Sequence, residues 1–97
     1  MVKYMVNIWG GPAGKAYSME FDDVQNEMEA AAVAVNHYLA TIPNLDAETI
    51  IDSSPVGVAP RPMKLRDLIG WLRKSEEGRA FVEKENLQAL VTRFAFD

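Results

Sequence analysis

Residues 23–42 read DVQNEMEAAAVAVNHYLATI, and this stretch decides the predicted fold. Apolar side chains recur at every third or fourth position along it, which places them on one face of an α-helix. Asp22 or Asp23 can cap the first turn, and Pro43 ends the run because proline cannot continue a helix. A helix over residues 23–42 would be about 30 Å long, about the diameter of a small domain, so we expect it to span a sheet.

The side of this helix that should face solvent carries small apolar residues in place of charged ones. Ala30, Val33, Ala34 and Ala40 lie there beside His37. A helix that is apolar on all sides packs against neighbours on two sides. The second neighbour is either another layer of the same domain or another molecule, and the sequence leaves both alternatives open. In the second case this face would be a partner or subunit interface.

Two segments with strand-like alternation precede the helix. Apolar residues occupy every second position over residues 2–8, and the alternation returns over residues 17–21. The sequence GGPAG at residues 10–14 lies between them and consists of turn-forming residues. These features predict a β-hairpin.

The remainder of the chain predicts one short strand, two helices and a final strand. Residues 49–51 are typical of a short buried strand, and residues 53–62 form a loop with three prolines. A second amphipathic helix follows, and Ser75 is the expected N-cap of a third. Residues 87–96 are rich in β-forming side chains, which predicts a strand.

The predicted order is therefore ββαβααβ within a single domain over residues 1–97. It comprises a β-hairpin, a long amphipathic helix, a short strand, two helices and a final strand. We expect the α+β class, with a mostly antiparallel sheet of about four strands covered by helices.

Composition narrows the functional classes. The 97 residues are 48% hydrophobic and 25% charged, as in folded globular proteins. No stretch approaches the ~20 apolar residues of a membrane span, and no signal-peptide pattern opens the sequence, so we expect a cytoplasmic protein that does not enter membranes. With no cysteine and only one histidine, we expect no metal, no cofactor and no enzymatic activity.

Four possible chemical sites have better structural explanations. Residues 10–15 lack the spacing of a phosphate-binding loop and read as a hairpin turn. His37 has no carboxylate three or four positions away. The adjacent acids Asp22-Asp23 and Glu76-Glu77 lie where helix N-termini favour acids, and Ser53-Ser54 has no associated base.

Charge is strongly segregated along the chain, which carries a net charge of −4. Residues 16–60 contain no lysine or arginine but hold eight acids. These acids are the predicted partner-binding residues Glu20, Asp22, Asp23, Glu27, Glu29, Asp46, Glu48 and Asp52. An acidic surface would attract a protein with a basic or nucleic-acid-binding surface and speed association. The alternative is a solvated face that only keeps the protein soluble.

The basic segment over residues 61–74 supports another hypothesis. Its candidate nucleic-acid-binding residues are Arg61, Lys64, Arg66, Trp71, Arg73 and Lys74. The cations can contact phosphates, and Trp71 is either a flank of the core or an exposed side chain on which a base stacks. An overall pI near 4.9 disfavours nucleic-acid binding.

No motif assigns the chain to a family. In size, acidity and lack of catalytic groups it is similar in a general way to small phage-encoded inhibitors of host machinery, including anti-CRISPR proteins. We therefore predict a non-enzymatic protein-binding inhibitor or regulator that acts through the acidic surface. The alternatives are a small oligomeric structural or assembly protein, and a nucleic-acid or nucleotide-binding module that uses residues 61–74.

Overall fold

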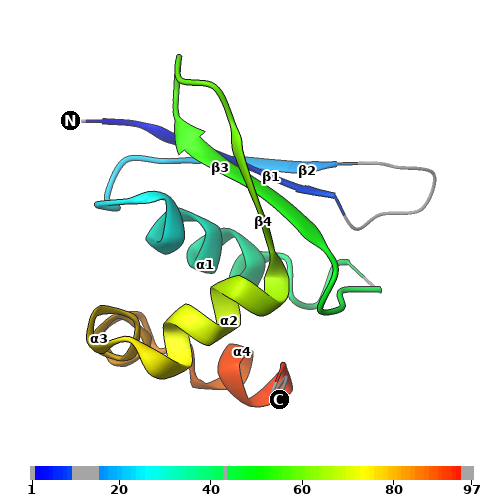
Figure 1. The fold of residues 1–97 in the computed structure, drawn as a ribbon, viewed down its shortest axis with the longest axis vertical. Coiled ribbons are helices and arrows are strands. Elements are labelled where there is room, and N and C mark those ends of the chain that lie inside the picture. The colour runs from blue at the N-terminus through cyan, green and yellow to red at the C-terminus, as the bar shows by residue number, and fades with distance from the viewer. Residues whose placement is uncertain (1, 10–15, 43, 95–97) are drawn as a thin grey trace.

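The computed structural model describes residues 2–9, 16–42 and 44–94, which form a four-stranded sheet with all its helices on one side (Figure 1). The strands are β1 (Tyr4–Trp9), β2 (Tyr17–Phe21), β3 (Ile50–Pro55) and β4 (Arg61–Lys64). They pair antiparallel throughout, in the order β2-β1-β3-β4. The predicted α+β class and four-stranded antiparallel sheet are therefore confirmed, as is the hairpin of β1 and β2.

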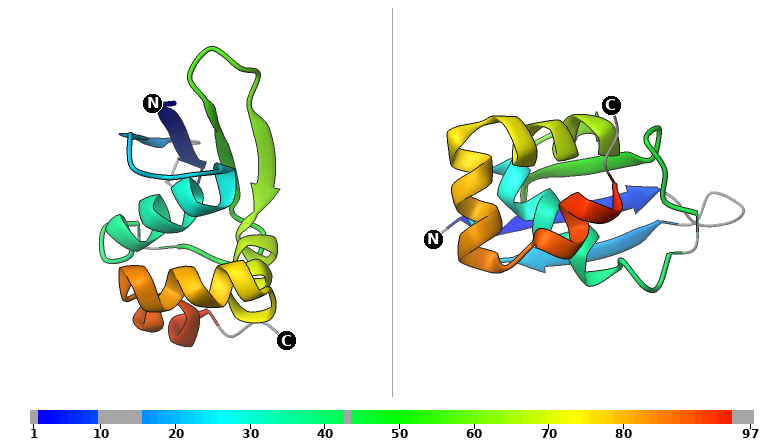
Figure 2. Two further views of the ribbon diagram at one scale, coloured as in Figure 1. Left: turned by 90° about the vertical axis from the view of Figure 1, so that its left-hand side faces the viewer. Right: turned by 90° about the horizontal axis from the view of Figure 1, so that it is seen from below.

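The helices build two layers beneath the sheet. They are α1 (Glu27–His37), α2 (Leu65–Lys74), α3 (Glu76–Glu85) and α4 (Gln88–Arg93). Helix α1 packs on β1 and β3, and α2 to α4 lie on its far side (Figures 1 and 2). Side chains alternate along β1, so Val6 and Ile8 enter the core whereas Asn7 and Trp9 point to the other face.

The small side chains of α1 are explained by its position between the two layers. Ala30, Ala31, Ala32 and Ala34 are all buried, because the helix packs against strands on one side and against helices on the other. Small residues allow both neighbours to approach closely. Of the two alternatives left open by the sequence, the structure selects a second layer of the same domain. Ala30 and Ala34 belong to the core and offer no interface to another molecule.

Helix α1 is shorter than the predicted helix over residues 23–42. Its N-cap is Asn26, whose side chain accepts the backbone N–H of Glu29, and the Glu29 carboxylate accepts the N–H of Gln25. This reciprocal pair satisfies two backbone donors, so the cap lies three residues beyond Asp23. The helix ends at His37, and a turn leads to the buried Ile42.

The fourth strand and the last helix also differ from the prediction. Strand β4 begins within the predicted loop over residues 53–62, which is instead a β-hairpin; Pro62 is tolerated because β4 is an edge strand. The segment predicted as a final strand contains helix α4, which buries Leu87, Leu90 and Phe94 on one side. Spacings of three and four residues are helical, so packing outweighed the β-propensity of this segment.

The junction of α2 and α3 follows the prediction and adds a close contact. The hydroxyl of Ser75 accepts the backbone N–H of Gly78 and donates to the carbonyl of Trp71, which confirms Ser75 as the N-cap of the third helix. Gly78 is buried against the backbone of Trp71 and Leu72. The two helices therefore meet almost backbone to backbone.

Candidate functional site

The second face of the sheet is not covered by any helix of the described residues (Figures 1 and 2). We call it the open face. Lys64 of β4 lies on this face opposite Ile50, and the strand registers assign the other side chains from β1, β2 and β3. They include Met5, Asn7, Trp9, Ser18, Glu20, Ile50 and Asp52.

Trp9 is the most prominent side chain of the open face. It is 46% exposed, and its indole N–H donates a hydrogen bond of 2.7 Å to the carboxylate Oδ2 of Asp52 on β3. This bond links two strands and holds the ring in one orientation. A large aromatic side chain that is both exposed and fixed loses little conformational entropy on binding, as in energetic hot spots of protein interfaces.

A row of polar side chains crosses the open face beside Trp9. Asn7 pairs with Ser18 on β2 and with Asp52 on β3, and the hydroxyl of Ser18 donates to the Asn7 side chain. Three neighbouring strands thus present hydrogen-bonding groups at one level of the sheet. A partner here would meet an ordered polar row next to an aromatic anchor.

The eight predicted acids do not form one continuous surface. Strand registers place Glu20 and Asp52 on the open face, and Asp22 lies at its rim beyond β2. The ammonium group of Lys3 lies 3.6 Å from the Glu20 carboxylate and 4.0 Å from that of Asp22, all three side chains being about half exposed. The structure therefore brings three of the eight acids to this face.

The other five acids lie elsewhere. Asp23 is in the connection to α1, Glu27 begins that helix, and Glu29 is committed to its cap. Asp46 and Glu48 lie before β3, where Asp46 accepts the backbone N–H of Glu48 and stabilises a turn. Phe21 and Ile50 lie at opposite ends of the sheet, so Asp23, just after β2, is separated from Asp46 and Glu48, just before β3, by about the length of the strands.

The basic segment is divided by its ion pairs. Glu48 lies 2.8 Å from the Lys64 ammonium group and 3.4 Å from the Arg66 guanidinium group. The hydrogen bond from Lys64 lowers the pKa of Glu48, and the positive charges of Arg66 and Lys64 act in the same direction. Lys64 and Arg66 are therefore already engaged by a carboxylate.

The remaining residues of the basic segment do not form a surface on which a base could stack. Trp71 is partly buried and packs against the core, so it is a core flank rather than an exposed stacking surface. Arg61 is exposed at the start of β4, whereas Arg73 and Lys74 lie in the last turn of α2.

A second exposed apolar feature lies at the tip of the β3–β4 hairpin, which projects from the body of the molecule (Figures 1 and 2). Val56 and Val58 are each 54% exposed. The N–H of Val58 bonds to the carbonyl of Pro55, and Gly57 has a φ of 91°, which is the geometry of a tight turn with glycine at its third position. The N–H of Val56 bonds to the carbonyl of Lys3, so this tip is fixed to the N-terminal strand.

The possible chemical sites have structural roles where they are described. His37 is exposed at the end of α1 and contacts the ring of Tyr38 edge-on. The hydroxyl of Ser53 donates to the carbonyl of Glu27, and that of Ser54 to the carbonyl of Val58. Residues 10–15 lie outside the described residues. Within the described ranges, no three His, Asp or Glu side chains gather as a metal site.

Comparisons with family models, curated proteins and solved structures find no match for this chain. Among the described residues, no helix is long and apolar enough to cross a membrane. The open face, which carries the exposed Trp9, is the candidate site that the geometry supplies. Neither Trp9 nor the valines of the hairpin tip were sequence candidates, although the alternation of residues 2–9 already places Trp9 opposite the core side chains.

Proposed function

We propose that this protein is a non-enzymatic protein-binding inhibitor or regulator that contacts its partner through the open face. The observation that carries the proposal is Trp9, which is 46% exposed and yet fixed by its hydrogen bond to Asp52. Exposed aromatic residues with a fixed orientation supply much of the binding energy in protein interfaces. The polar row through Asn7 then fixes the register of the partner.

The charges of the open face favour a protein partner over a nucleic acid. Glu20 is paired with Lys3, whereas Asp52 has no ion pair within 4.0 Å among the described residues. The Asp52 carboxylate would repel phosphates, and it can accept further hydrogen bonds beyond the one from Trp9. A partner surface that carries lysine, arginine or backbone N–H groups complements these carboxylates. Such a surface is characteristic of proteins that handle nucleic acids, so a cytoplasmic inhibitor of such a machine, comparable to anti-CRISPR proteins, is the specific form of the proposal.

Partner capture with matched variants tests this proposal. Tagged protein is incubated with lysate of its native host, with and without nuclease, and bound proteins are identified by mass spectrometry. We expect one protein to be captured in both conditions, and to be lost with Trp9→Ala but retained with Lys84→Ala, which removes an exposed side chain from α3. Because Trp9 is half exposed, Trp9→Ala should fold normally, which circular dichroism checks.

Three outcomes would contradict the proposal. Capture that Trp9→Ala leaves unchanged would show that the open face is not the contact surface. Capture that disappears with nuclease would favour nucleic-acid binding instead. Recovery of the tagged protein's own untagged copies alone would favour the assembly alternative, in which the same face joins subunits.

A further inference from the structure

The two edges of the sheet differ in what they offer to another strand. In antiparallel strands, successive residues direct their backbone N–H and C=O groups alternately to one side and to the other. The N–H of Val56 bonds to the carbonyl of Lys3, so the backbone groups of Lys3 face β3 and those of Tyr4 face β2. The strand registers carry this alternation across the sheet and identify the groups that point outward from β2 and β4.

The edge of β2 presents the backbone groups of Ser18 and Glu20. The odd-numbered residues of β2 bond to β1, so these two direct their N–H and C=O groups away from the sheet. The hydroxyl of Tyr38 donates to the Ser18 carbonyl at 3.2 Å, as expected of an outward carbonyl, and that oxygen can accept a second hydrogen bond. Strand β2 forms the margin of the described sheet (Figure 2), so this edge is open to a further strand.

The edge of β4 cannot pair in the same way. Pro62 points outward there and has no N–H to donate. The other outward residue, Lys64, is the N-cap of α2, and its side chain is engaged by Glu48. Prolines and charged side chains at an edge prevent strands from pairing. Since only one edge of the described sheet is open, association would stop at two copies and would not continue into a fibre.

The side chains of β2 match a second copy of the same strand. When two β2 strands pair antiparallel about a two-fold axis at Met19, Ser18 of each copy lies opposite Glu20 of the other, and the outward backbone groups exchange hydrogen bonds. Tyr17 then lies opposite Phe21 of the second copy, and both side chains are partly exposed. Aromatic pairs across strands are stabilising, whereas an axis at Glu20 would oppose two carboxylates.

The acids near this edge are already compensated by a lysine of the same chain. The Lys3 ammonium group lies 3.6 Å from the carboxylate of Glu20 and 4.0 Å from that of Asp22. Two copies can therefore bring their β2 edges together without opposing uncompensated carboxylates.

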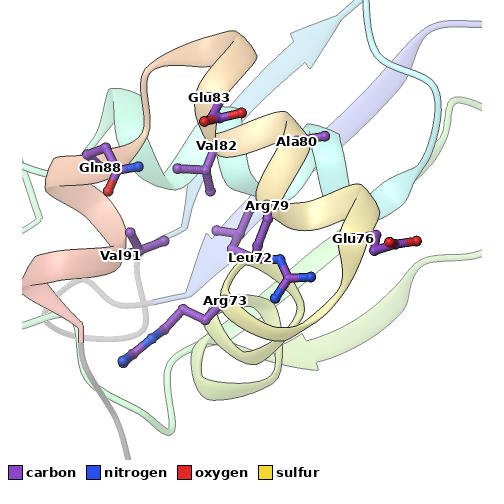
Figure 3. Close-up of a pocket in the computed structure, with 9 residues that line it drawn as sticks. All are labelled: Leu72, Arg73, Glu76, Arg79, Ala80, Val82, Glu83, Gln88 and Val91. Atoms are coloured by element: carbon purple, nitrogen blue, oxygen red, sulfur yellow. The ribbon is translucent and has the colours of Figure 1, made fainter.

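The hollow on the helical side of the molecule is less specific. It lies between α2, α3 and α4, and Arg73 and Arg79 line it together with Glu76 and Glu83, so charges of both signs are mixed there (Figure 3). The β2 edge differs from this hollow because the spacing and direction of its backbone groups specify one kind of partner, which is another strand.

We propose that the protein forms a dimer in which the β2 strands of two copies pair antiparallel and join the two sheets into one. Because the two-fold axis is perpendicular to the sheet, the two open faces become one continuous surface. The pairing uses the backbone of β2, so it does not depend on the function proposed for the open face. The strands are short and the interface is small, so association should be weak, with a Kd in the micromolar range.

Sedimentation equilibrium over protein concentrations from about 1 μM to about 1 mM tests the pairing. We expect the mass to rise from 10.8 kDa towards twice that value. Ser18→Pro should keep the mass at 10.8 kDa throughout, because it removes an outward N–H and leaves the bonds to β1 in place. Ser18→Ala loses the same side chain but keeps the N–H, so it should dimerise like the wild type. Circular dichroism checks that both variants fold.

Charges at Met19 locate the axis without the use of proline. Met19→Lys and Met19→Glu each place like charges opposite one another in the dimer, and each should weaken association by about threefold or more at low ionic strength. An equimolar mixture of the two variants should restore association, because unlike charges then face each other. A wild type that remains monomeric at about 1 mM, a folded Ser18→Pro that dimerises as well as Ser18→Ala, or a mixture that associates no better than its components would each overturn the proposal.

Discussion

Replacement of Gly78 by alanine is the sharpest test of the helical layers. An added Cβ would overlap the carbonyl oxygen of Trp71 and lie 2.7 Å from its carbonyl carbon and 2.8 Å from the Cα of Leu72. These are backbone atoms that cannot rotate away, so α3 would have to move off α2. Overpacking usually costs about 1–3 kcal/mol, and we expect Gly78→Ala to lie at or above the upper end of that range.

Gly70→Ala is the matched control. Gly70 lies inside α2, and a Cβ there would meet nothing within 4 Å. Alanine is the better helix former by about 0.8–1.0 kcal/mol, so this variant should be stabilised. Replacing glycine by alanine should therefore lower the free energy of unfolding at position 78 and raise it at position 70, eight residues earlier.

Thermal unfolding measures both effects. In a domain of this size 1 kcal/mol shifts the Tm by about 4–8 °C, so Gly78→Ala should lower the Tm by about 12 °C or more, and Gly70→Ala should raise it by a few degrees. A Gly78→Ala variant that melts within about 4 °C of the wild type would refute the close backbone contact of α2 and α3.

Three further predictions follow from local interactions. Ser75→Ala removes the side chain that accepts the N–H of Gly78, and should lower the free energy of unfolding by about 1 kcal/mol in urea denaturation, whereas Ser75→Thr should retain most of the cap. Ala34→Leu places a larger side chain between two layers and should cost about 1–3 kcal/mol, whereas Ala89→Leu on the exposed side of α4 should be nearly neutral in the same assay. Glu48 should titrate below an ordinary glutamate in ¹³C NMR, because the hydrogen bond from Lys64 lowers its pKa, and Lys64→Met should raise it again. Since this pKa is depressed in the folded state, any stabilisation from Glu48 is present above the pKa of an unfolded glutamate and is lost as the pH falls through the folded-state value.

The elements predicted correctly are those in which the hydrophobic pattern of the sequence agrees with the packing in the structure. The first hairpin alternates cleanly, and Ser75 precedes a helix with acids in its first turn, so both were predictable. The α4 segment combines β-forming residues with a helical spacing of Leu87, Leu90 and Phe94, and the spacing was the correct guide because these side chains face the core. Strand β4 was obscured by Pro62, which is compatible with a strand only because this strand lies at an edge.

The proposed binding surface depends on tertiary contacts that the sequence does not reveal. Alternation shows that Trp9 points away from Val6 and Ile8, but only the placement of all the helices on one side leaves it exposed. The acids at residues 20–52 form one run in sequence, but the fold places Asp22 and Asp23 at one end of the sheet and Asp46 and Glu48 at the other, with Glu20 and Asp52 on the open face between them.

The most direct test of the open face is acrylamide quenching of Trp9 fluorescence in a Trp71→Phe variant, which leaves Trp9 as the only tryptophan. In the free protein the quencher should reach Trp9 readily, because its side chain is 46% exposed. On addition of the captured partner, we expect quenching to fall strongly, since the indole ring becomes buried at the interface. Quenching that stays unchanged while the partner is bound would contradict the claim that the protein acts through its open face.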